Sequence, residues 1–132
     1  ITVILFDIDH FKQVNDTYGH DAGDRVLIQT TRLVRESLRQ DEIIGRYGGD
    51  EFVVLLPGSS CVQGRQIAER LWEKICAQVF TTEKGKFSIS LSLGIAELDR
   101  SGEDALETLL THADQALYTA KGGGRNQLAV YA

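Results

Sequence analysis

The chain has 132 residues, a formal net charge of −5 and a hydrophobic content of 42%, which is ordinary for one globular domain with a real core. An acidic chain without clustered Lys and Arg argues against a nucleic-acid groove and against an anionic membrane surface. No apolar run approaches the length of a membrane span, and no signal peptide is visible. We expect a cytoplasmic domain with no membrane contact of its own, although its parent protein could be anchored in a membrane.

The first third of the chain predicts a strand followed by helices. The apolar run 2–6 indicates a buried central strand, which ends at Asp7. A short helical turn is expected over 11–15, and a long helix near Asp21, whose side chain can cap the first turn. The apolar face of this helix is predicted from residues at three- and four-residue spacing: Leu27, Thr30 or Thr31, Val34 and Leu38.

The stretch 46–52, with the sequence RYGGDEF, lies between two apolar runs at 43–44 and 52–56. Glycine tolerates the positive φ that tight turns need, so the pattern predicts two strands joined by a hairpin turn. Taken alone, the stretch is more typical of a well-made hairpin with solvated acids at its tip than of a functional site.

The second half of the chain predicts two more helices and two more strands. A helix is expected over 62–79, and residues 87–95 alternate apolar with small residues, as in a strand with one buried face. After 99–102 a third helix is expected, ended by 121–125, and then a short strand over 128–131. The inward residues of the two helices are predicted to be Ile67, Leu71, Ile75 and Val79, then Leu106, Leu109 or Leu110, Ala113, Leu117 and Ala120. Cys61 and Cys76 match no metal-ligand spacing and are expected to be reduced.

The order strand, helix, strand, strand, helix, strand predicts an α+β fold with a ferredoxin-like βαββαβ core and an antiparallel-containing sheet, plus an appended helix and strand. In this topology the first and third strands are antiparallel neighbours. Asp7 should then lie beside Asp50 and Glu51, although they are more than forty residues apart. Clustered carboxylates repel unless a proton or cation lies between them, and an oxygen-rich site suits Mg²⁺ or Mn²⁺.

Four ordered blocks of the sequence resemble the GGDEF domain family, the diguanylate cyclases. They are the signature 46–52, the stretch 6–16, the stretch 18–24, and 114–121 continuing to 124–126. The resemblance identifies 1–132 as a single GGDEF domain with an adenylate-cyclase-like variant of the ferredoxin topology. The helix and the Leu-Thr-Gly-Leu-x-Asn-Arg motif with which family members begin are lacking. The chain also begins within an apolar run and has no Met, so we expect a segment of a longer protein.

The resemblance implies synthesis of cyclic di-GMP from two GTP, with release of two pyrophosphates. Each domain would bind one GTP and face a second domain, so a homodimer is implied, at least transiently. The resemblance also implies Mg²⁺ or Mn²⁺ as the cofactor and a sensory or regulatory domain in the parent chain.

The resemblance assigns metal binding to Asp7, to Asp50 and to the backbone carbonyl of Ile8. Asp50 is also the candidate acceptor of the 3′-hydroxyl proton, although a carboxylate beside a cation has a low proton affinity. Glu51 would support a second metal or the nucleotide, or equally be a solvated turn residue. Lys12 completes the catalytic set, as a cation for the phosphates.

Further positions match the nucleotide-binding residues of the family. Asn15 and Asp24 match the guanine-reading positions, and an amide and a carboxylate can pair with the guanine edge; Asp24 also suits the start of a helix. His20 matches a position near the substrate, with a surface loop residue as the alternative. The remaining matches are the phosphate-binding Lys121 and Arg125, which also suit a helix C-terminus, and the turn residues Gly48 and Gly49.

A candidate product-inhibition site precedes the signature. Many family members carry Arg-x-x-Asp there, and this chain has Arg39 with Glu42 in place of Asp. Arg70 matches a second inhibitory contact. Solvated helix surface is the slightly favoured interpretation of both arginines.

Three other functions compete with an active cyclase. An impaired GGDEF module could bind GTP or cyclic di-GMP for signalling, but such modules typically lose the acids and the lysine that this chain retains. A phospho-acceptor receiver needs alternating βα units throughout, which the hairpin interrupts. A mixed GMP–AMP cyclase is disfavoured by Asp24 at the guanine position.

Overall fold

The computed structural model describes residues 1–98 and 105–131, and the predicted loop 99–102 lies outside them. The described helices are α1 (Phe11–Tyr18), α2 (His20–Ser37), α3 (Cys61–Cys76) and α4 (Ala105–Gly122). The strands are β1 (Thr2–Ile8), β2 (Ile43–Arg46), β3 (Glu51–Leu56), β4 (Phe80–Thr82), β5 (Gly85–Phe87), β6 (Leu91–Glu97) and β7 (Gln127–Val130).

A mixed five-stranded sheet organises the molecule, in the order β2-β3-β1-β6-β7. The central strand β1 pairs antiparallel with both β3 and β6, and β7 adds to β6 in parallel. The predicted α+β fold and the predicted pairing of the first and third strands are therefore confirmed.

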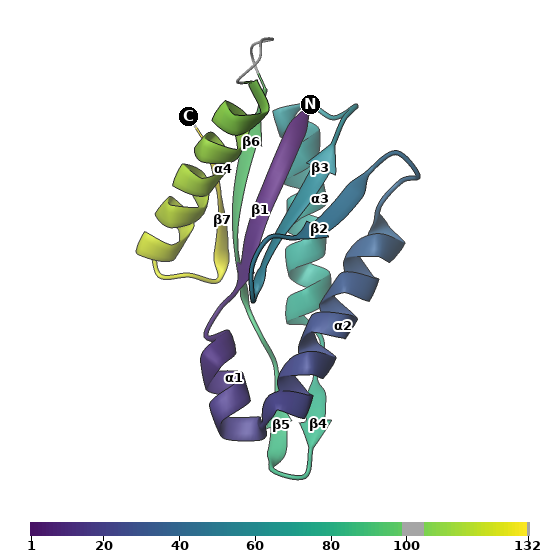
Figure 1. Ribbon diagram of the computed structural model, residues 1–132, viewed down its shortest axis with the longest axis vertical. Helices are drawn as coiled ribbons and strands as arrows, with labels where there is room; N and C mark the ends of the chain where they lie inside the picture. Colours follow the sequence, from purple (N-terminus) through teal and green to yellow (C-terminus); the bar gives the residue numbers. More distant parts are fainter. Residues whose placement is uncertain (99–104, 132) are drawn as a thin grey trace.

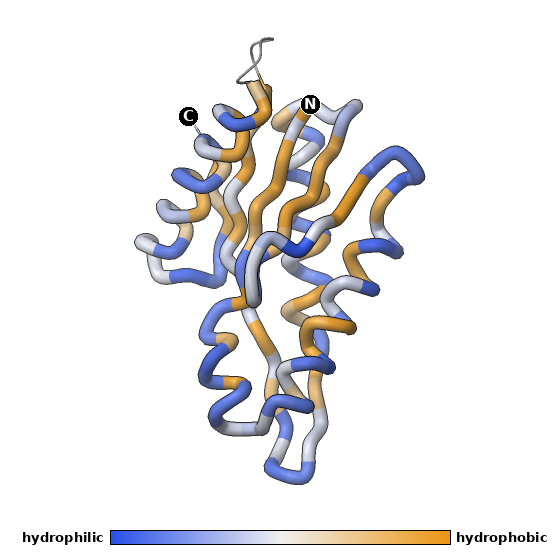
Figure 2. The backbone as a smooth tube through the Cα atoms, viewed as in Figure 1, coloured by the Kyte–Doolittle hydropathy of each residue, from blue (hydrophilic) through white to orange (hydrophobic). Residues whose placement is uncertain are grey.

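Helices cover both faces of the sheet, with α2 and α3 on one face and α4 on the other (Figure 1). Successive side chains of β1 point to opposite faces of the sheet, so the strand contributes to a hydrophobic core on each face. Ile4, Phe6 and Ile8 pack toward α2 and α3, while Val3 and Leu5 pack toward α4. Both faces of β1 are buried, so the strand appears as a nearly continuous apolar run in Figure 2.

The prediction that the strand over 87–95 buries one face is wrong in two respects. The strand β6 starts only at Leu91, and its residues 91–96 are buried on both faces. Gly94 and Ala96 of β6 face α4 and let that helix approach closely. A β-carbon on Gly94 would collide with the backbone of Ala113 and Leu117, so the absence of a side chain there sets the spacing of α4.

The predicted helix boundaries and faces also need correction. The helix α2 begins at His20 and its N-cap is Gly19, with no side-chain cap, so Asp21 lies in the first turn without capping it. Only Gly19 separates α1 from α2, and a glycine has no side chain with which to cap the helix. The helix α3 ends at Cys76, so Val79 lies beyond it and is 66% exposed. The buried face of α2 includes the predicted Thr30 and Val34 and extends to Ala22, Gly23, Val26 and Leu33, while Leu27 and Leu38 are only partly buried against the same core. In α4, Leu106 is exposed and not inward as predicted.

The hairpin β4–β5 was not predicted, and it supports the corner between α1 and α2. The ring of Phe87 stacks on Tyr18 with 4.3 Å between centroids. Arg25 of α2 donates a hydrogen bond of 2.9 Å to the carbonyl of Thr81. These contacts join the hairpin to the two helices that carry the predicted guanine-reading residues.

Two further sequence predictions can be compared with the structure. Cys61 and Cys76 are both free thiols, as expected. Across 1–98 and 105–131, none of the helices combines the length and the apolar character needed to cross a membrane.

Candidate active site

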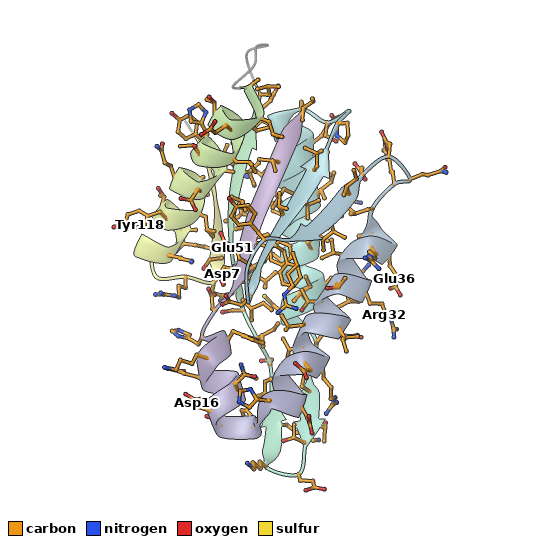
Figure 3. All side chains as sticks on the ribbon, viewed as in Figure 1. Asp7, Asp16, Arg32, Glu36, Glu51 and Tyr118 are labelled. Atoms are coloured by element: carbon orange, nitrogen blue, oxygen red, sulfur yellow. The ribbon has the colours of Figure 1, made fainter. Side chains whose placement is uncertain are left out.

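The acids predicted to converge do meet at one end of the sheet. Asp7, at the end of β1, lies opposite Glu51, the first residue of β3. The N–H of Ile8 donates to the carbonyl of Asp50 at 3.2 Å, which fixes the signature turn against β1. Figure 3 shows Asp7 and Glu51 close together where β1 leaves the sheet, near the C-terminal end of α4.

The Asp7 carboxylate is the most constrained group of this cluster. Its side chain is only 13% exposed, and one oxygen, Oδ2, forms an ion pair with Lys121 of α4. The other oxygen, Oδ1, is buried and has no hydrogen-bond donor among the described residues. Burial, followed by the neighbouring Asp50 carboxylate, raises the pKa of Asp7 from 3.8 to about 6, against the opposing effect of Lys121.

The pKa values of Glu51 and Lys121 are also raised in this cluster of acids. Burial raises the pKa of Glu51, and the negative charge of Asp7 raises it further. The pKa of Lys121 is also raised: burial favours its neutral form, but the hydrogen bond to Asp7 and the nearby acids outweigh burial. The cluster therefore holds excess negative charge that one ammonium only partly neutralises.

The chemistry of this donor set fits a divalent metal of the magnesium type. A buried carboxylate oxygen without a donor, beside a second carboxylate, needs either a shared proton or a cation. Within the described residues, no group of three or more His, Cys, Asp or Glu side chains could hold a metal alone. Mg²⁺ usually takes one or two carboxylates and completes its shell with waters and substrate phosphates, so Asp7 and Asp50 could suffice as its side-chain ligands.

The signature turn is held from within by residues on either side of it. The N–H groups of Tyr47 and Gly48 donate to the carbonyl of Glu51 at 2.7 and 3.2 Å. The guanidinium of Arg46 donates to the carbonyls of Gly48 and Gly49. We did not predict a role for Arg46; the pattern of glycines that predicted the turn carries no information on which side chain would hold it.

Asp9 is a second structural residue that we did not predict. It is 6% exposed and accepts hydrogen bonds of 2.6 Å from the hydroxyls of both Ser90 and Ser92. It also accepts one of 2.9 Å from the N–H of Asn126, in the turn between α4 and β7. Asp9 thus ties the end of β1 to β6 and to the turn beside Lys121.

The end of α4 and the turn after it carry the two basic residues predicted to bind phosphate. Lys121 lies in the last turn of α4. Arg125 is exposed, and its own backbone is in the left-handed region, with φ of 63°. The N–H of Arg125 donates to the carbonyl of Ala120 at 3.1 Å, which closes the helix end. The structure places Lys121 in the acid cluster, while Arg125 is exposed to solvent.

The predicted guanine-reading residues occupy the corner of α1 and α2. The side chain of Asn15 lies over Gly23, where a β-carbon would collide with the Asn15 Oδ1. Asp24 directly follows Gly23, so it lies next to the contact between Asn15 and Gly23. Asp24, His20 and Lys12 are all exposed. Lys12 lies in the first turn of α1, where N–H groups lack intrahelical acceptors.

The three residues of the candidate product-inhibition site line one cavity of about 270 Å³. The cavity lies between the loop that joins α2 to β2, the turn that joins β3 to α3, and α3 itself. Glu42 does not simply point to solvent, because its carboxylate accepts a 2.7 Å hydrogen bond from the N–H of Arg39. Arg70 reaches the same cavity from α3.

Comparison with known proteins places this geometry in context. The family model for the diguanylate cyclase GGDEF domain matches residues 1–127. Diguanylate cyclase DgcP of Pseudomonas aeruginosa is 46% identical over 130 residues, which cover 98% of this chain and 19% of DgcP. Response regulator PleD of Caulobacter vibrioides is 38% identical over 127 residues, covering 96% of this chain and 28% of PleD. The chain thus spans less than a third of either relative.

Solved structures agree with the fold. The GGDEF domain of DgcB from Caulobacter crescentus, in complex with c-di-GMP, superposes with a TM-score of 0.90 at 28% identity, covering 98% of this chain and 77% of that chain. The active GGEEF domain of a diguanylate cyclase from Vibrio cholerae also gives 0.90, at 32% identity, covering 99% and 82%.

Proposed function

Because this chain belongs to the GGDEF family of diguanylate cyclase domains, we propose that it condenses two GTP into cyclic di-GMP and releases two pyrophosphates. The observation that carries the proposal is the acid cluster at the end of β1. Asp7 there retains a buried oxygen without a donor, next to Asp50. A structural hairpin has no need for such an arrangement, whereas a cation site for a triphosphate does.

The reaction requires a phosphoryl transfer at each of two nucleotides. The 3′-oxygen of one GTP attacks the α-phosphorus of the other, and the bond to the bridging oxygen of the β-phosphate breaks, so pyrophosphate leaves. The 3′-hydroxyl proton passes to a base, for which Asp50 is the candidate. A second, reciprocal transfer closes the ring, so a homodimer, at least transient, follows from the chemistry.

We propose that Asp7, Asp50 and the carbonyl of Ile8 hold Mg²⁺ or Mn²⁺. When bound, the ion supplies positive charge against the phosphates and the carboxylates. Glu51 lies beside these ligands and would support them or the nucleotide. Burial, and after it the negative charge of Asp7, raises the pKa of Glu51.

The remaining side chains would bind and orient the nucleotide. Lys121 is already in the cluster and can exchange its contact with Asp7 for a phosphate oxygen once a cation neutralises the acid. Lys12 and Arg125 would add charge at the edges, and Gly48 and Gly49 leave room for the ligand. Asn15 and Asp24 would read the guanine, and His20 begins the same helix as Asp24.

The cavity lined by Arg39, Glu42 and Arg70 supports product inhibition as a secondary proposal. Glu42 keeps the charge of the usual Asp but is longer, and it is engaged with the Arg39 backbone. Inhibition should therefore be weaker than with an aspartate. The chain spans only a small part of the length of DgcP and PleD. We therefore also propose a sensory or regulatory domain elsewhere in the parent protein.

The alternative function is a GGDEF module that binds GTP or cyclic di-GMP without catalysis. Product analysis after incubation with GTP and Mg²⁺ separates the two. We expect cyclic di-GMP from the wild type and from Glu83→Ala, a control acid in the exposed β4–β5 turn, but none from Asp50→Ala or Asp7→Ala. A folded, dimeric wild type that binds GTP and yields no product would overturn the cyclase and favour the binding module.

A further inference from the structure

The side chain of Arg46 donates hydrogen bonds to the backbone of the signature turn. Its Nε donates to the carbonyls of Gly48 and Gly49 at 3.2 and 3.0 Å, and a terminal guanidinium nitrogen donates to the Gly49 carbonyl at 2.6 Å. The residue is exposed, so the contacts do not result from burial. One planar cation therefore binds two successive carbonyls of the signature turn.

The planarity of the peptide group gives these contacts a second consequence. In a trans peptide the C=O and the N–H point in opposite directions. With the carbonyls of Gly48 and Gly49 bound to Arg46, the N–H groups of Gly49 and Asp50 must point away from the guanidinium. Neither N–H donates a hydrogen bond within the described part of the chain, so both can bind an anionic oxygen.

Arg46 also completes the fixation of Asp50. On the C-terminal side of Asp50, the carbonyl is held by the N–H of Ile8 at 3.2 Å. On the N-terminal side lie two glycines, which populate many backbone conformations when nothing restrains them. The guanidinium restrains that side, so the Asp50 carboxylate is oriented from both directions.

We propose that Arg46 is a positioning residue of the signature turn, which orients the Asp50 carboxylate and aims the Gly49 and Asp50 N–H groups at a phosphate oxygen of the nucleotide. This inference rests on the proposed cyclase function. Arg46 acts through the backbone of the turn, and not through its own charge on the substrate. A lysine keeps the charge but cannot bind two carbonyls in the same planar geometry, so it should not replace Arg46.

The test compares Arg46→Ala and Arg46→Lys with Arg35→Ala. Arg35 and Arg46 line one groove beside α2, but the side chain of Arg35 makes no hydrogen bond to the turn in the described part of the chain. Amide hydrogen exchange of the free protein reports the turn directly, because the N–H groups of Tyr47 and Gly48 are bonded to Glu51 across it. Steady-state kinetics with GTP and Mg²⁺ then separate kcat from KM, and circular dichroism checks the fold.

We expect exchange at Tyr47 and Gly48 to rise by about 10-fold in both Arg46 variants and to stay unchanged in Arg35→Ala. The kcat should fall by about 10- to 100-fold in both, with a smaller change in KM, because a displaced acid costs mainly the chemical step. Unchanged exchange in Arg46→Ala would overturn the proposal. So would a normal kcat despite faster exchange, or full rescue by lysine, which would indicate a charge contact. A wild type without product would refute the cyclase function, while the exchange result would still decide whether Arg46 holds the turn.

Discussion

Asp7 shows at the level of a single residue why a cation is expected at the end of β1. One of its oxygens is satisfied by Lys121, and the other is buried without any donor among the described residues. Such a carboxylate must share a proton, remain destabilised, or bind a metal ion. The protonation of this carboxylate therefore links protein stability to pH and to metal binding.

The raised pKa of Asp7 predicts a pH-dependent cost to folding in the absence of metal. Because the folded-state value is about 6 and the ordinary value 3.8, the native state binds the proton more tightly, and stability is lost as pH rises through this range. Relative to Asp7→Asn, the wild type should lose about 1–3 kcal/mol between pH 4 and 7. Denaturant unfolding with a chelator would measure this, and Mg²⁺ should reduce the loss. A difference between the two proteins that does not change with pH would contradict the assignment.

Removing the charge of Lys121 should have opposite effects on metal and nucleotide. Lys121 competes with a cation for Asp7, so Lys121→Met should tighten Mn²⁺ binding to the nucleotide-free protein by about 3- to 10-fold. The same variant should weaken GTP binding, because a phosphate contact is lost. Calorimetry measures both, and Lys84→Met in the β4–β5 turn is the control. Weaker Mn²⁺ binding would show that Lys121 does not compete with the metal.

The sequence allowed the acid cluster to be predicted but not the contacts around it. Asp7 and the signature acids lie at strand ends, so the strand order alone brings them together. The roles of Asp9 and Arg46, and the pairing of Lys121 with Asp7, depend on side-chain directions at turns. Residues 117 positions apart, such as Asp9 and Asn126, meet only once the turn after α4 has formed.

At the level of elements, the close contact of β6 with α4 positions one side of the site. The helix delivers Lys121 to the acid cluster, and the missing side chain of Gly94 allows the helix to lie against the strand. The period-two pattern predicted a strand here, but a pattern of small residues can mean either a solvated face or a closely packed one. The structure shows the second, since Ser92, Gly94 and Ala96 are all buried.

Gly94→Ala should therefore destabilise the fold strongly. The added carbon would meet the backbone of Ala113 and Leu117, which cannot move aside as a flexible side chain would. We expect a loss of about 2–4 kcal/mol in the free energy of unfolding, measured with denaturant. Gly122→Ala is the matched control, because a β-carbon there meets nothing within 4 Å. Equal stability of the two variants would show that α4 can shift away from β6 at little cost.

Helices and strands were predicted more reliably than their ends. Apolar periodicity identified α2, α3 and α4, but the buried face of α2 is wider than the predicted one, and α3 ends before Val79. The hairpin β4–β5 has only three residues in each strand, too few for a periodic pattern. Its pairing is supported by the aromatic contacts of Phe87 with Tyr18 and Phe80.

At the level of the whole molecule, the proposed nucleotide-binding residues lie around one end of the sheet. The acids of β1 and β3, the basic end of α4 and the corner of α1 and α2 surround this end, while the apolar cores lie between the layers (Figures 1 and 2). Under the proposed function each chain would hold one GTP in this arrangement, and the chemistry needs two.

Activity should therefore depend on the pairing of two chains. At concentrations where the chain is mainly monomeric, the specific activity should rise in proportion to protein concentration, and then level off when dimers predominate. Product formation measured across a dilution series, with the oligomeric state followed by analytical ultracentrifugation, would test this. A specific activity that stays constant while the protein is monomeric would contradict a reaction between two domains.

We propose that the acids at the end of β1 form a cation site for a nucleotide. Electron paramagnetic resonance of Mn²⁺, titrated with a non-hydrolysable GTP analogue, tests it most directly. We predict that Asp7→Ala and Asp50→Ala each weaken Mn²⁺ binding by about 10-fold or more, while Glu83→Ala binds it as the wild type does. If folded Asp7→Ala and Asp50→Ala bind Mn²⁺ as tightly as the wild type, the metal lies elsewhere and the account is wrong.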